Sequence, residues 1–257
     1  MCGVLCAGEE VIRRLTGCTD DAEVRVMWLR LYRTFIEAID AIDNGVSQYD
    51  TTLKPTYRIN TDLSSRVGYL NNSHPWDPTS QHATQDDRFE AASQLTGREF
   101  TEALMFCYHE WLPARRVVQT AIERRHDVHP SGVIVRLDEL VVWKSHIASL
   151  EDELALSPQL LYVLYADERG KWRVQCVPAA EDSFQSRKAL PEAWRGIRDD
   201  ALSALTGIPG CIFVHASGFI GGAETYESAL AMAVASWEMP GQIEGGNKKQ
   251  KVDEMKL

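Results

Sequence analysis

Gly210-Cys-Ile-Phe-Val-His-Ala-Ser-Gly-Phe-Ile-Gly-Gly222, followed by Ala223 to Trp237, is the stretch that decides the fold of this chain. The apolar run from Cys211 to Val214 favours a strand that is buried on both faces. The glycines after it predict a turn, because glycine readily adopts positive φ and lets the backbone approach a neighbour or ligand. Apolar residues then recur at helical spacing, at Tyr226, Leu230 and Trp237. We therefore predict a strand, a glycine turn and a helix, as in an α/β sheet.

A turn of this kind aims free backbone N–H groups past the start of the helix, where a phosphate could bind. His215 and Ser217 would lie at the edge of this phosphate site, beside Gly218, Gly221 and Gly222. Glu224 and Glu227 argue against an anion there, because acids in the first helical turn already complement the helix dipole. The alternative is a tight turn in a packed sheet, and glycine spacing alone favours that alternative.

Composition limits the class of protein. The chain has 257 residues, of which 44% are hydrophobic and 25% are charged, as in globular proteins with a sizeable core. Its net charge of −10 argues against broad, sequence-blind nucleic-acid binding but allows a local basic groove. No apolar run approaches the roughly 20 residues that span a bilayer, and the first residues resemble neither a signal peptide nor a transit peptide. We expect an intracellular protein that does not cross membranes.

The six cysteines occur singly and without a C-x-x-C pair. This pattern is typical of buried thiols in a reducing compartment. Cys2 and Cys6 are a weak candidate for a metal pair, since no second pair follows them.

An amphipathic helix is predicted from Asp20 or Asp21, which would cap it, to Gly45, which would end it. Glu37, Asp40 and Asp43 recur every three residues and share one face of that helix. The dipole disfavours anions in the last turn, so a divalent cation is one candidate partner for Asp40 and Asp43. A solvated acidic edge is the alternative, and the spacing alone favours it.

Residues 46–85 are rich in polar residues and proline, and we predict that they form a loop. A second long helical pattern runs from Asp86 to about Arg125 and is interrupted at Pro113. The arginines of that pattern are expected to form a solvated helix face; they are Arg115, Arg116, Arg124 and Arg125.

Strands are predicted beyond residue 132: one or two over Val133–Val142, and a hairpin formed by Leu160–Ala166 and Lys171–Val177. Alternation places Arg173 on the polar face of the second hairpin strand. An irregular segment, Ser183–Arg198, carries Arg187, Lys188 and Arg195 around Trp194. Cations beside an aromatic ring suit a phosphate and a stacked base, although acids are interleaved with them.

Six blocks in order resemble the melanocyte-proliferating-gene (Myg) exonuclease family of the DHH phosphoesterase superfamily, which is RecJ-like. They cover the chain from about residue 5 to 237, and they are Glu37-Ala-Ile-Asp-Ala-Ile-Asp-Asn-Gly45, Leu63-Ser-Ser-Arg-Val-Gly68, Trp111-Leu-Pro-Ala-Arg115, Tyr162-Val-Leu-Tyr165 with Trp172-Arg-Val-Gln175, Ser186-Arg-Lys-Ala-Leu-Pro191 with Trp194-Arg-Gly196, and His215-Ala-Ser-Gly-Phe-Ile-Gly-Gly222.

The resemblance implies a fold of class α/β with four segments. Residues 1–50 would be the remnant of a doubly wound DHH-type catalytic domain, and residues 51–126 a loop and long linker helices. Residues 127–238 would form a smaller mixed-sheet α/β domain that binds substrate, and residues 239–257 a disordered tail.

The resemblance also implies a metal-dependent hydrolase, a 3′→5′ exonuclease acting on single-stranded RNA, in the mitochondrion and the nucleus or nucleolus. Divalent manganese or magnesium would be the cofactor. Asp43 matches the last aspartate motif of the metal site, with Asp40 as its neighbour. His215, Ser217 and the glycines match the substrate-binding motif. The candidate backbone contacts are Arg66, Arg115, Arg173, Arg187, Lys188 and Arg195.

The chain departs from the family pattern in two ways. It contains no Asp-His-His triplet and no histidine before His74, so most metal ligands are expected upstream of Met1. Ala223 stands where the family usually has asparagine. We therefore expect an N-terminally truncated phosphoesterase, inactive alone and possessing no complete metal site. The alternative is a non-catalytic RNA- or nucleotide-binding or interaction module.

Overall fold

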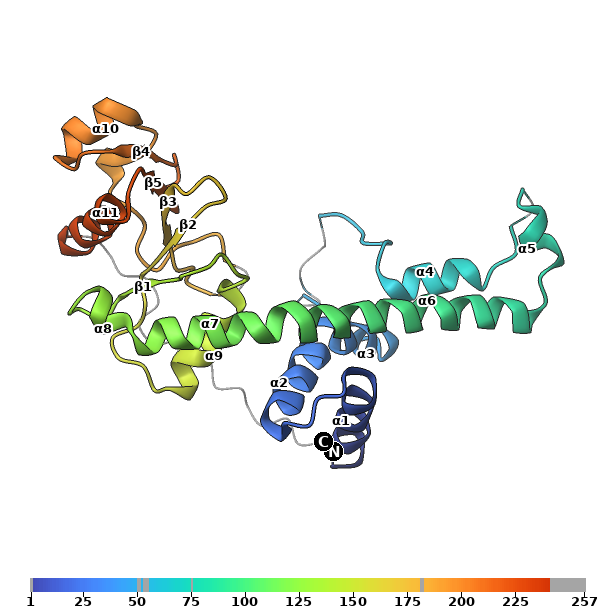
Figure 1. Ribbon diagram of the computed structural model, residues 1–257. Coiled ribbons are helices and arrows are strands. Elements are labelled where there is room, and N and C mark those ends of the chain that lie inside the picture. Colours follow the sequence, from blue (N-terminus) through green and yellow to red (C-terminus); the bar gives the residue numbers. More distant parts are fainter. Residues whose placement is uncertain (1, 50–51, 53–55, 75, 181–182, 241–257) are drawn as a thin grey trace. The chain divides into compact units, whose positions relative to one another are not determined.

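The computed structural model describes residues 2–49, 52, 56–74, 76–180 and 183–240 (Figure 1). The chain forms two compact units, Met1–Pro113 and Ala114–Leu257. Their border falls inside the segment 51–126 that was predicted to hold linker helices. Almost all of the predicted tail lies outside the described residues, because these end at residue 240. Among the described residues, none of the helices combines the length and the apolar character that crossing a bilayer requires.

The regular structure described in the first unit is helical. Its elements are α1 (Cys2–Thr16), α2 (Asp21–Leu31), the π-helical turn η1 (Tyr32–Ile36), α3 (Glu37–Asp43), α4 (Leu63–Leu70), α5 (Pro78–His82), α6 (Gln85–Phe106) and the π-helical turn η2 (Cys107–Trp111). Its core packs apolar residues of α2 against α6 and η2, including Val24, Leu31 and Leu104. The prediction that residues 1–50 are the remnant of a doubly wound domain stays a prediction.

The helix predicted after Asp20 is confirmed as α2, η1 and α3 in succession. The Asp20 carboxylate caps it by accepting the Glu23 N–H at 2.9 Å. The helix ends at Asp43, followed by Gly45 with φ +67°. The prediction that residues 46–85 are only loop is wrong where α4 and α5 form. Asp62 and Asp77 supply N-caps to these two helices, and each carboxylate accepts a backbone N–H of the first turn.

The second unit is a mixed α/β fold, which confirms that class for this part of the chain. The helix α7 (Leu112–Glu123) begins at the border, and the remaining elements are α8 (Arg125–Val128), β1 (Ile134–Arg136), α9 (Lys144–Glu153), β2 (Tyr162–Ala166), β3 (Trp172–Cys176), the 3₁₀ turn η3 (Glu192–Trp194), α10 (Asp199–Thr206), β4 (Cys211–Val214), β5 (Ile220–Ala223) and α11 (Tyr226–Glu238).

Five strands form one sheet in the order β1-β2-β3-β5-β4. Strands β1 and β2 are parallel, and the other neighbours are antiparallel. The predicted hairpin is confirmed as β2 and β3, with Tyr165 opposite Arg173. The strand predicted over Val133–Val142 is shorter, because only Ile134–Arg136 pairs with β2.

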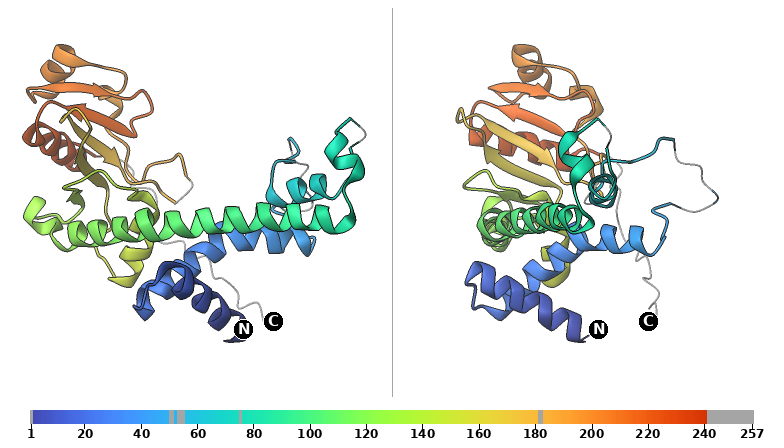
Figure 2. Two further views of the ribbon diagram at one scale, coloured as in Figure 1. Left: turned by 45° about the vertical axis from the view of Figure 1, so that its right-hand side comes forward. Right: turned by 90° about the vertical axis from the view of Figure 1, so that its right-hand side faces the viewer.

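The two faces of the sheet are covered differently. On one face, Tyr162, Leu164 and Val174 pack against α11, which runs beside the sheet in both figures (Figures 1 and 2). On the other face, Val163 and Tyr165 pack against α7 and α9. The strand residues of this second core come from β1 and β2 alone. Where β3, β5 and β4 continue this face, the register places Arg173, Gly222 and Phe213 on it.

Candidate nucleic-acid interface

The glycine-rich stretch forms a β-hairpin followed by a helix. Strands β4 and β5 are joined by a turn in which the Gly218 N–H donates to the His215 carbonyl at 2.8 Å. Gly218 has φ +75°, which favours glycine. The prediction of a strand leading through the paired glycines into a helix is therefore wrong, because Gly221 and Gly222 lie within β5.

Packing explains both glycines of β5. A Cβ on Gly221 would lie 3.0 Å from Leu190 Cδ1 and 3.1 Å from Met232 Cε. A Cβ on Gly222 would lie 2.6 Å from Phe213 Cε1 and 2.8 Å from Arg173 Nη1. Because β5 pairs with β3 on one side and β4 on the other, its backbone groups enter the sheet ladders and do not form an open phosphate cradle.

Arg173, Phe213 and Arg198 form a cluster above Gly222, which we call the cation–aromatic cluster. The guanidinium carbons of Arg173 and Arg198 lie 5.4 and 5.8 Å from the centre of the Phe213 ring. The Arg173 side chain is 21% exposed and forms an ion pair with Asp167. The Arg198 side chain is 66% exposed, and its Nε lies 3.9 Å from the exposed Asp199 carboxylate. Each guanidinium is attracted to the face of the aromatic ring. The exposed Arg198 guanidinium also leaves a positive charge at the protein surface.

Asp167 holds Arg173 in this position. Burial alone would raise the pKa of the Asp167 carboxyl group, but the backbone N–H groups of Lys171 and Arg169 and the charge of Arg173 lower it below its usual value. Asp167 therefore stays ionised at neutral pH and partly neutralises Arg173.

His215 lies in the turn next to this cluster and is exposed. Its Nδ1 accepts the Ser217 N–H at 3.2 Å and lies 2.9 Å from the Ser217 hydroxyl. Because Nδ1 is an acceptor, the neutral imidazole carries its proton on Nε2. His215 can thus donate one hydrogen bond at the surface.

Lys188, Arg195 and Ser217 line one cavity of about 700 Å³, together with Leu190, Pro191 and Met239 among others. The Lys188 ammonium donates to the carbonyls of Trp237 and Met239 at 2.7 and 2.9 Å, and burial lowers its pKa. Arg195 Nε donates to the Leu190 carbonyl at 3.1 Å. The fold thus places three of the predicted substrate contacts in the lining of one cavity.

The other predicted cations already have carboxylate partners. Arg187 is buried and pairs with Glu151, and Arg115 is buried and pairs with Glu153 and the Ser149 hydroxyl. Arg66, in the first unit, pairs with Glu99. The substrate-binding roles expected of these arginines stay predictions, and each guanidinium would have to leave or share its partner to hold a phosphate.

The acidic end of α3 lies in the first unit. Asp40 and Asp43 are exposed, and the Asp40 carboxylate accepts a hydrogen bond from the Asn44 amide at 3.1 Å. Within the described ranges, no group of three or more histidine, cysteine or acidic side chains could hold a metal ion. Two exposed carboxylates on one helix end do not form a resident Mn²⁺ or Mg²⁺ site, because such a site needs further ligands. The residues described here therefore do not fit the metal that the resemblance implies.

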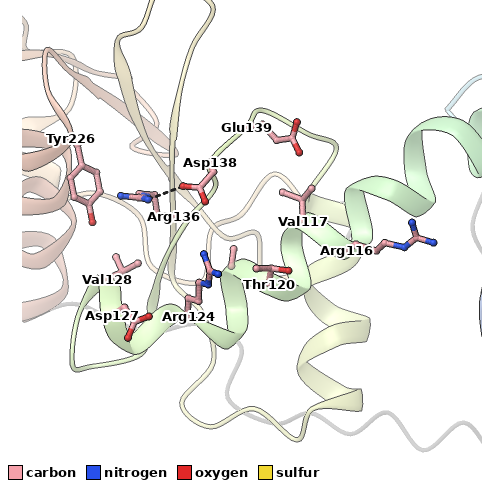
Figure 3. Close-up of a pocket in the computed structure, with 11 residues that line it drawn as sticks. Arg116, Val117, Thr120, Arg124, Asp127, Val128, Arg136, Asp138, Glu139 and Tyr226 are labelled. Atoms are coloured by element: carbon pink, nitrogen blue, oxygen red, sulfur yellow. Dashed lines mark hydrogen bonds and ion pairs between the residues drawn. The ribbon is translucent and has the colours of Figure 1, made fainter.

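A second cavity, of about 470 Å³, was not predicted (Figure 3). It lies between α7, α8, the end of β1 and the start of α11, and its lining includes Arg124, Arg136, Asp138 and Tyr226. Arg124 belongs to the arginines that the sequence assigned to a solvated face. The sequence carried no signal for the approach of Tyr226 to Arg136, since this contact joins residues ninety positions apart through the sheet.

Comparison with known proteins identifies the family. The model of the family MYG1_exonuc, described as "Uncharacterised protein family (UPF0160)", matches residues 6–237. The chain belongs to this family. It is 46% identical over 233 residues to "MYG1 exonuclease" of Homo sapiens, covering 89% of this chain and 60% of that protein. It is 40% identical over 227 residues to "MYG1 protein" of Dictyostelium discoideum, covering 88% and 68%.

This membership confirms the family expected from the six blocks. "MYG1 exonuclease" of Rattus norvegicus is also 46% identical over 233 residues, which cover 89% of this chain and 59% of that protein. The chain thus spans about 60% of the length of its mammalian relatives. No solved structure matches the chain.

Proposed function

We propose that this chain is the nucleic-acid-holding part of an exonuclease that acts on single-stranded RNA in the 3′→5′ direction. The observation that carries the proposal is the cation–aromatic cluster, in which two guanidiniums approach the Phe213 ring. Among the described residues, the buried core formed by α7 and α9 on this sheet face includes strand residues of β1 and β2 but none of β4. The named activity of the mammalian relatives supports the nuclease class.

The chemistry of the cluster suits an unpaired strand. A base can stack on an aromatic ring or a guanidinium plane, and a guanidinium can also pair with a phosphate. In our proposal, Phe213 and Arg198 contact a base and its phosphate, and His215 donates its Nε2 proton to a second phosphate. Arg195 and Ser217 are further candidate contacts from their shared cavity. Because the net charge is −10, binding is local and not spread over the surface.

We assign no catalytic step to the described residues. Cleavage by the family is proposed to need manganese or magnesium, and Asp43 and Asp40 would supply at most a part of the ligands. The second candidate function is therefore a non-catalytic RNA- or nucleotide-binding module, which the same cluster supports equally. Mitochondrial and nuclear locations remain proposals that imaging of a tagged chain would test.

Fluorescence anisotropy with a single-stranded RNA of about ten nucleotides tests the proposal, since such a strand spans a typical binding groove. We expect Phe213→Leu to weaken binding about tenfold through lost stacking. Arg198→Gln should reduce the salt slope by about one. Arg14→Gln is the matched control, because Arg14 is exposed on α1 in the first unit and is not part of the cluster. Absence of RNA binding by the wild-type chain at every salt concentration would refute the proposal.

A further inference from the structure

The cavity of about 470 Å³ beside β1 shares no residue with the cation–aromatic cluster. All its lining residues belong to the second unit. Its volume is within the usual range of small-molecule sites, about 300 to 1,000 Å³. A ligand of nucleotide size therefore fits it.

Three arginines line this cavity, and two of them, Arg124 and Arg136, face its interior, because the Arg116 side chain extends away from them in Figure 3. Arg136 lies with its guanidinium carbon 5.3 Å from the centre of the Tyr226 ring and forms a 2.8 Å ion pair with Asp138. Arg124 is exposed and has no ion-pair partner among the described residues. In Figure 3 the Arg124 side chain extends toward the side where Arg136 and Asp138 lie. The guanidiniums of Arg124, between α7 and α8, and of Arg136, at the end of β1, thus line the same cavity.

Acidic residues also line the cavity and decide how strongly an anion can bind. Asp138 is engaged by Arg136, and Figure 3 shows Glu139 directed away from Arg124. Asp127 lies on α8, at the far side of Arg124 from Asp138 in the same view. Asp138 is therefore the acid that competes most directly with a bound anion for the Arg136 guanidinium.

Apart from these charged residues and Arg116, the lining is apolar or carries a neutral hydroxyl group. Val117, Ala121 and Val128 form an apolar part, and Thr120 and Tyr226 add hydroxyl groups. A ligand that satisfies both parts has an anionic head for the arginines and a flatter, less polar body for the apolar side. A nucleoside monophosphate has this combination, whereas inorganic phosphate has only the head.

We infer that this cavity binds a nucleotide, with its phosphate between Arg124 and Arg136 and its nucleoside against Val117, Ala121 and Val128. The phosphate displaces Asp138 from Arg136 on binding. The same phosphate chemistry could come from a free mononucleotide or from the terminal phosphate of a short oligonucleotide. The inference stands whether or not the cation–aromatic cluster binds RNA.

Isothermal titration calorimetry on the full chain tests this inference with AMP, adenosine, inorganic phosphate, and a trinucleotide with and without a terminal phosphate. We expect AMP to bind more tightly than adenosine or inorganic phosphate. Equal binding of the two trinucleotides, with AMP bound, would identify the free mononucleotide as the ligand. Preference for the phosphorylated trinucleotide over AMP would identify the strand end.

Matched variants distinguish this site from any other. Arg124→Gln should weaken AMP binding at least about tenfold, as expected for a charged hydrogen bond. Asp138→Asn should strengthen it several-fold, because it removes the competitor for Arg136. Arg14→Gln should leave it unchanged. Arg124 lacks an ion-pair partner among the described residues, so its replacement should not unfold the protein, and circular dichroism checks this.

Three results would overturn the inference. They are no AMP binding by the wild-type chain, the same affinity for AMP in Arg124→Gln as in wild type, and the same affinity for adenosine as for AMP. If Phe213→Leu abolishes RNA binding while AMP binding persists, the proposed function and this inference are both supported. If RNA fails to bind while AMP binds and depends on Arg124, the proposed function alone fails.

Discussion

Arg187 is buried in the second unit with its guanidinium paired in two places to the Glu151 carboxylate, at 2.7 and 2.8 Å. Both residues also contact the backbone of Leu160: Glu151 accepts its N–H at 2.8 Å, and Arg187 donates to its carbonyl at 3.0 Å. The pair therefore fixes α9 and the segment before η3 onto the start of β2. A residue that resembles a phosphate contact in the sequence is a structural ion pair in the fold.

Removing one partner of this pair should destabilise the second unit strongly. Arg187→Met leaves the Glu151 carboxylate buried without its counter-charge, and breaking a buried pair in this way costs about 3–5 kcal/mol. Urea unfolding followed by circular dichroism measures the loss. Glu224→Gln is the control, because Glu224 and its partner Lys171 are 48% and 42% exposed, and breaking such a surface pair should cost under about 1 kcal/mol. Equal effects of the two variants would contradict the structural role of Arg187.

Gly222→Ala should destabilise the sheet and weaken RNA binding together. Its Cβ would lie 2.6 Å from the Phe213 ring and push both Phe213 and Arg173 out of place, which costs about 1–3 kcal/mol as overpacking does. Thermal unfolding and RNA anisotropy measure the two effects. Gly97→Ala is the matched control, since a Cβ there meets no atom within 4 Å in the helix α6. That control should raise stability by about 0.5–1 kcal/mol.

Acid should weaken the second unit through Asp167. Its folded-state pKa is lowered, so its stabilising contribution is complete above the unfolded pKa and is lost as the pH falls through the folded one. The loss should begin below about pH 5, given an ordinary aspartate pKa near 3.9. Urea midpoints of wild type and Asp167→Asn measured against pH should converge in acid. Parallel curves at all pH values would show that Asp167 does not contribute.

The buried cysteines should resist alkylation while the protein is folded. Burial raises the pKa of the Cys107 and Cys176 thiols to about 12, so little thiolate exists at pH 8. Iodoacetamide labelling followed by mass spectrometry should modify these two cysteines only after denaturant is added. Rapid labelling of Cys176 in native buffer would show that the core between the sheet and α11 opens readily.

The chain alone should not hydrolyse RNA in the presence of manganese. The described residues provide no group of three or more metal-ligand side chains, and Asp40 and Asp43 are exposed. End-labelled RNA resolved on a denaturing gel should remain intact over hours. Turnover by the wild type that Asp43→Ala abolishes would overturn this expectation and would assign the metal site to α3.

Local signals in the sequence were sufficient for most helices and for the β2–β3 hairpin. Asp20 and Gly45 mark the ends of the helical stretch that contains α2 and α3, and the caps Asp62 and Asp77 explain α4 and α5, which the loop-like composition concealed. These features depend on neighbours within a few residues, so sequence contains the information that determines them.

The site could be predicted only in part. Glycine in a turn and glycine in a crowded central strand are identical in sequence, and only the approach of Phe213 and Arg173 from other strands distinguishes them. The same holds for Lys188, whose ammonium contacts two carbonyls at the end of α11. Such long-range contacts follow from the strand order, which periodicity does not reveal.

The strand β5 consists of Ile220, two glycines and Ala223, so it contributes almost no side chain of its own to either core. Its place between β3 and β4 is determined by the groups that close over it, chiefly Phe213, Leu190 and Met232. Loosening any of these neighbours should therefore be detectable first as faster amide hydrogen exchange at Gly221 and Gly222, before the rest of the sheet responds. The exchange rates of the β5 amides would therefore indicate whether the side chains on either face of the sheet remain packed against this strand.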